Sequence, residues 1–140
     1  MKKRVFGALR DLANEKCLSL RVRGHSMAPI LPDGSTVQVA PRSVYLPGDV
    51  IAFAAPNGSL RVHRVLGYHR GASGWRLLTK GDNTTWIDSP VPVDQVLGLV
   101  RGGDCARSVY QVSWRERLTA MDFFCRKSVA WLWRQLANPS

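Results

Sequence analysis

Between residues 17 and 100 the sequence is divided into short runs rich in apolar residues, and Gly or Pro lies between them. In the first run, Leu18, Leu20 and Val22 alternate with polar residues, which is the period of a strand with one buried face. Similar runs predict further strands at 34–40, 50–55, 60–68, 75–80 and 96–100, with a break at 102–104 after the last one. Many short strands at close spacing predict a mainly β, compact and partly barrel-like domain.

Two segments outside these runs have the period of amphipathic helices. In residues 3–16, Val5, Leu9 and Leu12 share one helical face, with Phe6 and Ala13 beside it. From Ser113 onwards, apolar residues recur at spacings of three and four and form a stripe along one helix: Trp114, Leu118, Met121, Cys125, Val129, Leu132 and Leu136. We therefore expect an N-terminal amphipathic helix in residues 1–16, a β domain in 17–104, and a basic, Trp-rich helical extension in 105–140.

Charge is the unusual part of the composition, because 20 Lys and Arg stand against 10 Asp and Glu, a net charge of +10. Such an excess suits nucleic acid, an anionic membrane surface or an acidic peptide. The basic residues are spread along the chain, and no zinc-finger spacing, RNA-binding aromatic motif or phosphate-binding loop is present. We expect no nucleic-acid partner. Two readings of the terminal helices stay open: they contact an anionic lipid surface, or they pack onto the β domain or a partner protein.

The N-terminal segment has no uninterrupted apolar core, because Arg10, Asp11, Asn14 and Glu15 divide it. No other stretch approaches the roughly 20 apolar residues of a membrane-spanning helix. We therefore expect neither a secretory signal nor a transmembrane helix, and a protein that is cytoplasmic or peripheral at the membrane surface.

The three cysteines, Cys17, Cys105 and Cys125, are widely spaced and odd in number. They form neither a disulfide framework nor the C-x-x-C pair of a metal site. We expect no metal and no cofactor.

One serine lies where a strand is expected to end, in Gly24-His25-Ser26-Met27-Ala28-Pro29. Such a junction can expose the hydroxyl and leave nearby backbone N–H groups free to hold an oxyanion. A serine before a proline is also a common N-cap or turn residue. To act as a nucleophile, Ser26 needs a base that accepts its proton.

Among the candidate bases, His63 lies in the middle of a predicted strand, which would hold it rigidly, and an imidazole titrates near neutral pH. The alternative is an exposed sheet histidine among arginines. His25 is adjacent to Ser26, so its side chain should point away from the hydroxyl, and His69 is expected in solvent. Lys80 is the rival base, although its place before a glycine at a strand end favours a solvated side chain.

Two carboxylates follow, Asp82 in Gly81-Asp82-Asn83 and Asp88 before Ser89-Pro90. A carboxylate there would accept a hydrogen bond from an imidazole N–H and stabilise its charged form. Aspartate is equally a standard turn residue, so the two readings stay open on these residues alone.

The order of these pieces resembles type I signal peptidases over roughly residues 18–100. The resemblance is carried by Ser26-Met27-x-Pro29, Pro47-Gly48-Asp49-Val50-Ile51-Ala52-Phe53, His63-Arg64-Val65, Lys80-Gly81-Asp82-Asn83, and Val91-Pro92 with Val96–Val100. It implies the signal-peptidase β fold and a serine endopeptidase that cleaves a leader or signal-like segment of a peptide or protein, after small residues.

Within that family the chain is similar to the archaeal and endoplasmic-reticulum branch, because histidine stands where the bacterial form has lysine. The resemblance then implies Ser26 as nucleophile, His63 as general base, and Asp82 or Asp88 as the orienting carboxylate. Three departures stand out: Ile30 replaces a usual threonine, Gly24 replaces a hydroxyl residue that helps hold the oxyanion in bacterial relatives, and the family's transmembrane anchor is missing. Loss of one oxyanion donor lowers a rate by roughly 10²–10³-fold, unless backbone N–H groups substitute.

Two alternatives remain. The self-cleaving SOS-repressor proteases share the fold and a Gly-x-Ser-Met start, although they use a lysine base. A non-catalytic module on the same fold would bind a membrane or a partner protein through its basic surface.

Overall fold

The computed structural model describes residues 3–137. Residues 1–2 and 138–140, the outer ends of the two predicted terminal segments, lie outside the described residues. The elements in chain order are α1 (Lys3–Glu15), β1 (Leu18–Arg21), β2 (Thr36–Ala40), β3 (Val50–Ala54), β4 (Leu60–Gly71), β5 (Gly74–Lys80), β6 (Val91–Pro92), a 3₁₀ turn (Val93–Gln95), β7 (Val96–Gly103), a second 3₁₀ turn (Arg107–Val109) and α2 (Trp114–Ala137).

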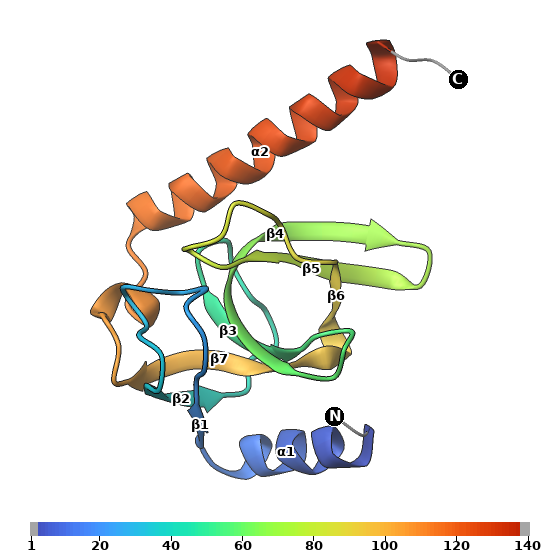
Figure 1. Ribbon diagram of the computed structural model, residues 1–140. Coiled ribbons are helices and arrows are strands. Elements are labelled where there is room, and N and C mark those ends of the chain that lie inside the picture. Colours follow the sequence, from blue (N-terminus) through green and yellow to red (C-terminus); the bar gives the residue numbers. More distant parts are fainter. Residues whose placement is uncertain (1–2, 138–140) are drawn as a thin grey trace.

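The strands form one curled sheet in the order β1-β2-β7-β3-β4-β5-β6, and every neighbouring pair is antiparallel. Figure 1 shows the half-barrel that this sheet makes, with α1 on one side and α2 on the other. The mainly β, partly barrel-like fold with a helix at each end is confirmed.

Strand β3 lies in the middle of the sheet and is buried on both faces, because its residues are apolar without alternation. Val50 and Ala52 belong to one hydrophobic cluster, while Ile51 and Phe53 belong to the other. Two packed faces hold this strand rigidly, and its partner β4 takes its register from it, with Ile51 opposite His63.

The expected break after residue 100 is wrong. Strand β7 continues to Gly103, because Gly102 and Gly103 pair with Gln38 and Val37 of β2. Strand β4 likewise runs past the expected end at residue 68 to Gly71, where it pairs with β5 across a tight turn. Local Gly content indicated a turn, whereas the pairing partner across the sheet kept the backbone extended.

The N-terminal helix forms as expected, but its buried face is rotated from the expected one. Phe6 and Ala13 are buried against the sheet and Leu9 is partly buried with them, whereas Val5 and Leu12 are exposed. The sheet surface, rather than the periodicity alone, decided which apolar residues of α1 pack.

Helix α2 contacts the body through its first half only. Ala120 is buried, Phe123 and Phe124 are half-buried, and the Phe124 ring is 3.3 Å from where a Cβ on Gly67 of β4 would lie. Every residue from Cys125 to Ala137 is exposed, and this half projects away from the sheet in Figure 1. Within residues 3–137, no helix combines the length and the apolar character that crossing a membrane requires.

Candidate active site

Ser26 lies in the connection between β1 and β2, which folds back on itself. Val22 donates its backbone N–H to Ser35 O at 2.8 Å, and Gly24 donates to the Asp33 carboxylate at 2.8 Å. Gly24 has a φ of 95°, which a residue with a side chain rarely adopts, so glycine allows the chain to turn just before the serine. The turn leaves Ser26 half-buried.

His63 faces this serine from β4. Its Nε2 is 3.0 Å from Ser26 Oγ, although 37 residues separate the two in sequence. The imidazole is 5% exposed, and the edge of the Phe53 ring packs against it with 5.9 Å between ring centroids. His63 therefore has one rigid orientation with the serine hydroxyl in hydrogen-bonding range.

Asp88 contacts the opposite side of the imidazole, with Oδ2 2.5 Å from His63 Nδ1. Thr79 donates its hydroxyl to the same oxygen at 2.8 Å, and Arg61 Nη1 lies 3.5 Å from Oδ1. Burial on its own would raise the pKa of Asp88, but the hydrogen bond and charge of His63, with Thr79 and Arg61, outweigh it and lower the pKa below its ordinary value. The carboxylate is ionised at neutral pH and accepts a hydrogen bond from Nδ1–H, which leaves Nε2 as the acceptor for Ser26.

Asp82 has a different partner. It accepts two hydrogen bonds from the guanidinium of Arg64, at 2.9 and 2.8 Å, and Arg64 also donates to Gly48 O at 2.7 Å. No hydrogen bond or ion pair joins Asp82 to His63 among residues 3–137. Of the two carboxylates left open by the sequence, Asp88 contacts the imidazole and Asp82 anchors the loop that follows β5.

That loop holds the backbone of the serine. Asn83 donates its N–H to Ser26 O at 2.8 Å and its side-chain amide to His25 O at 3.0 Å. A Cβ on Gly81 would lie 2.6 Å from Ser26 O, so only glycine permits this approach. The motif Gly81-Asp82-Asn83 therefore positions Ser26 rather than His63.

The other candidate bases lie elsewhere. Lys80 donates its ammonium to Gly81 O at 3.0 Å and stands 5.3 Å from the centre of the Phe123 ring. His25 and His69 are exposed, and neither side chain is hydrogen-bonded to Ser26. The exposed positions of His25 and His69 agree with the expectation, whereas Lys80 is partly buried rather than solvated.

The sequence did not identify Thr79 and Arg61 as site residues, although both contact Asp88. The strand alternation of 75–80 does place Thr79 on the same face as Leu77, which is buried, and a buried hydroxyl requires a partner. That signal was present in the sequence, but the identity of the partner was not.

The backbone offers a donor for an oxyanion. Ser26 N–H makes no hydrogen bond to any described residue, whereas the N–H of Gly24 is already used by Asp33. The turn thus leaves at least one N–H free beside the hydroxyl, in place of the side chain that Gly24 lacks.

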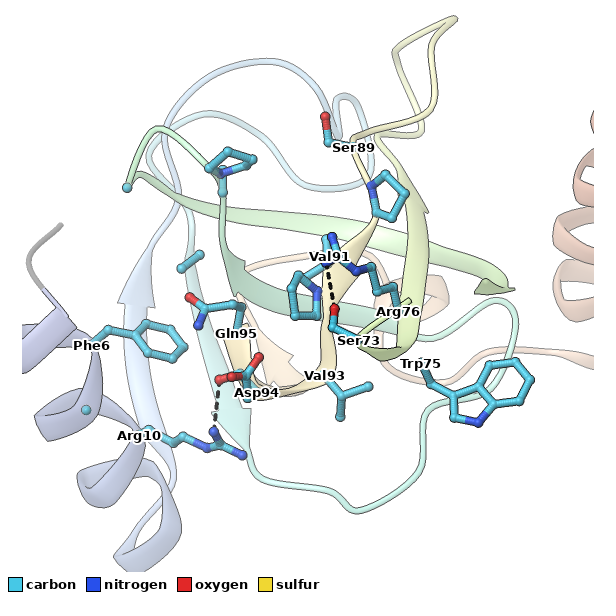
Figure 2. A pocket seen from close by; sticks show the side chains of 17 residues that line it. Phe6, Arg10, Ser73, Trp75, Arg76, Ser89, Val91, Val93, Asp94 and Gln95 are labelled. Atoms are coloured by element: carbon cyan, nitrogen blue, oxygen red, sulfur yellow. Dashed lines mark hydrogen bonds between the residues drawn. The ribbon is translucent and has the colours of Figure 1, made fainter. Parts of the chain in front are cut away.

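A groove of about 520 Å³ opens onto Ser26 and His63, between the β1 segment and the start of β4. A larger pocket of about 1030 Å³ lies between α1 and the strands near β6. Figure 2 shows its lining, with Arg10 of α1 reaching the backbone oxygen of Asp94 at 2.9 Å. Neither Ser26 nor His63 lines that pocket, so the smaller groove is the candidate active site.

No three His, Cys, Asp or Glu side chains in the described part of the chain are grouped closely enough to hold a metal ion. At this site a hydroxyl, an imidazole and a carboxylate form a hydrogen-bonded series.

Comparison with protein families matches residues 3–100 to the family described as Peptidase S24-like. The matched segment includes α1, β1 to β6 and all four candidate site residues, and it ends within β7. No curated protein matches the chain.

Proposed function

This chain belongs to the Peptidase S24-like family, and we propose that it is a serine endopeptidase with Ser26 as nucleophile, His63 as general base and Asp88 as the orienting carboxylate. The observation that carries the proposal is the unbroken series of contacts from Ser26 Oγ through both nitrogens of His63 to Asp88, at 3.0 and 2.5 Å. Serine hydrolases on unrelated folds share this arrangement.

In the proposed reaction, Ser26 Oγ attacks the carbonyl carbon of the peptide bond while His63 Nε2 accepts the hydroxyl proton. The tetrahedral oxyanion is held by backbone N–H groups, that of Ser26 among them. His63 then gives the proton to the leaving amine, and the C–N bond breaks. Water, deprotonated by the same imidazole, hydrolyses the acyl-enzyme and restores Ser26.

Asp88 supports this cycle in two ways. It holds the Nδ1–H tautomer of His63, and it stabilises the imidazolium that forms when Nε2 is protonated. Asp82 acts indirectly. It is a positioning residue for the loop that binds the backbone of Ser26.

The substrate we propose is an extended segment of a leader or signal-like peptide, with small residues before the cut. Strand β1 is an edge strand of the sheet and borders the groove. Its outer backbone groups are available to pair with an added strand, which would bring the peptide bond past Ser26. This preference for small residues follows from the likeness to signal peptidases of the Ser–His branch.

Self-cleavage, as in the SOS-repressor proteases, is the second candidate because it too belongs with this fold. It is less favoured here, since those enzymes use a lysine and Lys80 is bound to Gly81 O and Phe123 instead of Ser26.

We also propose that the protein associates with anionic membrane surfaces through α2. The residues of its apolar stripe are exposed, and its second half carries Trp131 and Trp133, both more than 60% exposed. Basic residues exceed acidic ones on this helix, five to two, counted as Arg115, Arg117, Arg126, Lys127 and Arg134 against Glu116 and Asp122. Aromatic and basic residues beside an apolar stripe are typical of helices that lie in a lipid interface.

The test of the peptidase proposal is labelling and cleavage by matched variants. A fluorophosphonate should phosphonylate Ser26 in the parent protein, with loss of fluoride, and leave Ser26→Ala unlabelled. Cleavage of peptides with alanine before the cut should fall by about 10³-fold or more in Ser26→Ala and in His63→Ala. His69→Ala, an exposed histidine on the same strand, is the control and should retain the parent rate. Equal rates in the parent and Ser26→Ala would show that the proposal is wrong.

A further inference from the structure

Three arginines line the groove that holds Ser26 and His63. Arg21 and Arg23 come from β1 and the residues after it, and Arg61 comes from the start of β4. No Asp or Glu is among the described residues that line this groove. The walls that would face a bound peptide are therefore basic on both sides.

The charge on these arginines is poorly compensated. Arg21 and Arg23 are exposed and form no ion pair with any carboxylate in residues 3–137. Arg61 is 3.5 Å from Asp88, but this carboxylate also accepts the shorter hydrogen bonds of His63 and Thr79. When His63 is protonated during turnover, one carboxylate faces two cations. A net positive potential thus remains over the groove.

The arginines alternate with apolar residues. Along β1 and its continuation, Leu20 and Val22 are half-buried, whereas Arg21 and Arg23 are exposed. A peptide that pairs with β1 places successive side chains on alternate faces in the same way. Its residues on one face would meet the arginines, and those on the other would meet the apolar wall.

We propose that Arg21, Arg23 and Arg61 make the enzyme selective for substrates that carry Asp or Glu in the extended segment beside the cleaved bond. This inference rests on the proposed peptidase function and names the substrate class. An acidic side chain opposite an arginine stabilises a strand pair, and a basic one destabilises it. Substrates with Lys or Arg in this segment are correspondingly disfavoured.

The probe is a set of internally quenched peptides with alanine before the cut, in which a single Glu, Gln or Lys is moved through the four preceding positions. At one or more positions we expect kcat/KM for Glu to exceed that for Lys by about tenfold, because the exchange converts a favourable cross-strand charge pair into an unfavourable one. The ratio should approach one in 0.5 M NaCl, since salt screens exposed charges. Dissociation constants of the same peptides for Ser26→Ala, which does not cleave them, should show the same order.

The double variant Arg21→Glu/Arg23→Glu should invert the preference, so that Lys peptides become the better substrates. Arg101→Glu/Arg107→Glu is the matched control, because it makes the same change of charge at two exposed residues that do not line the groove, and it should leave the Glu-to-Lys ratio as it is. Equal use and equal binding of Glu, Gln and Lys peptides by the parent would overturn this inference and leave the peptidase intact. Failure of the fluorophosphonate to label Ser26 would refute the peptidase function itself, and the inference would fall with it.

Discussion

Asp82 and Asp88 lie close in sequence but differ in what they contact. Asp88 is brought to His63 because the loop after β5 returns to the strand, where Asp88 N–H donates to Thr79 O at 2.9 Å. Asp82 stays at the start of the loop and pairs with Arg64. One carboxylate therefore contacts the imidazole, and the other holds the loop through Arg64.

Substituting each with asparagine separates the two roles. Asp88→Asn should lower kcat by about 10³–10⁴-fold, because an amide does not hold the required tautomer or stabilise the imidazolium. Asp82→Asn should keep most of kcat but lower the free energy of unfolding by about 1–3 kcal/mol, since Arg64 loses a charged partner in a partly buried site. Peptide cleavage measures kcat of both variants, and urea unfolding measures their free energy of unfolding. A loss of kcat in Asp82→Asn as large as in Asp88→Asn would contradict the assignment.

At the scale of elements, α2 has two distinct apolar surfaces. One is formed by Ala120, Phe123 and Phe124 and packs on the body, with Arg117 bonded to Asp49 at 2.9 Å. The other is the apolar stripe, whose residues are exposed. Substitutions on the packed surface should therefore lower the free energy of unfolding, whereas substitutions on the stripe should lower membrane binding without changing stability.

Leu132→Ser/Leu136→Ser should abolish most binding to vesicles of phosphatidylglycerol and phosphatidylcholine, yet leave the urea midpoint unchanged, because both leucines are already in water. Phe124→Ala, the control, should lower the free energy of unfolding by about 1–3 kcal/mol because it removes packing against Gly67. Cosedimentation and urea unfolding give the two readouts. Vesicle binding by the double variant equal to that of the parent would argue against α2 as the membrane contact.

At the scale of the whole molecule, charge links stability to pH. Asp88 has a lowered pKa in the folded protein, against an ordinary value of 3.8. A carboxyl of this kind stabilises the fold above its unfolded pKa, and the contribution is lost as the pH falls through the lower, folded pKa. Acid also removes the 10 negative charges of Asp and Glu that offset half of the 20 positive charges of Lys and Arg, which increases repulsion across the molecule.

The free energy of unfolding should therefore fall when the pH is lowered below about 3.8. The difference in unfolding free energy between the parent and Asp88→Asn should be larger at pH 7 than at pH 3, because the general repulsion is common to both proteins. Urea unfolding at the two pH values measures it. A difference that grows towards pH 3 would have the wrong sign for a lowered pKa.

The sequence by itself determined the positions of most strands, both helices and the candidate pair Ser26 and His63. These depend on local signals: a period of two or 3.6 residues, Gly and Pro between runs, and residue types in a characteristic order. Those signals are properties of neighbouring residues, so they are readable before the chain folds.

Only the tertiary structure decided which aspartate meets His63, which face of each helix packs, where β7 ends, and that three arginines surround the nucleophile. Each of these depends on contacts between segments far apart in the chain, such as the 25 residues that separate His63 from Asp88. Side-chain type and period are the same for a residue that finds a partner across the sheet and for one that stays in water. The curl of the sheet determines which partner a residue contacts, and that contact determines the role of the residue.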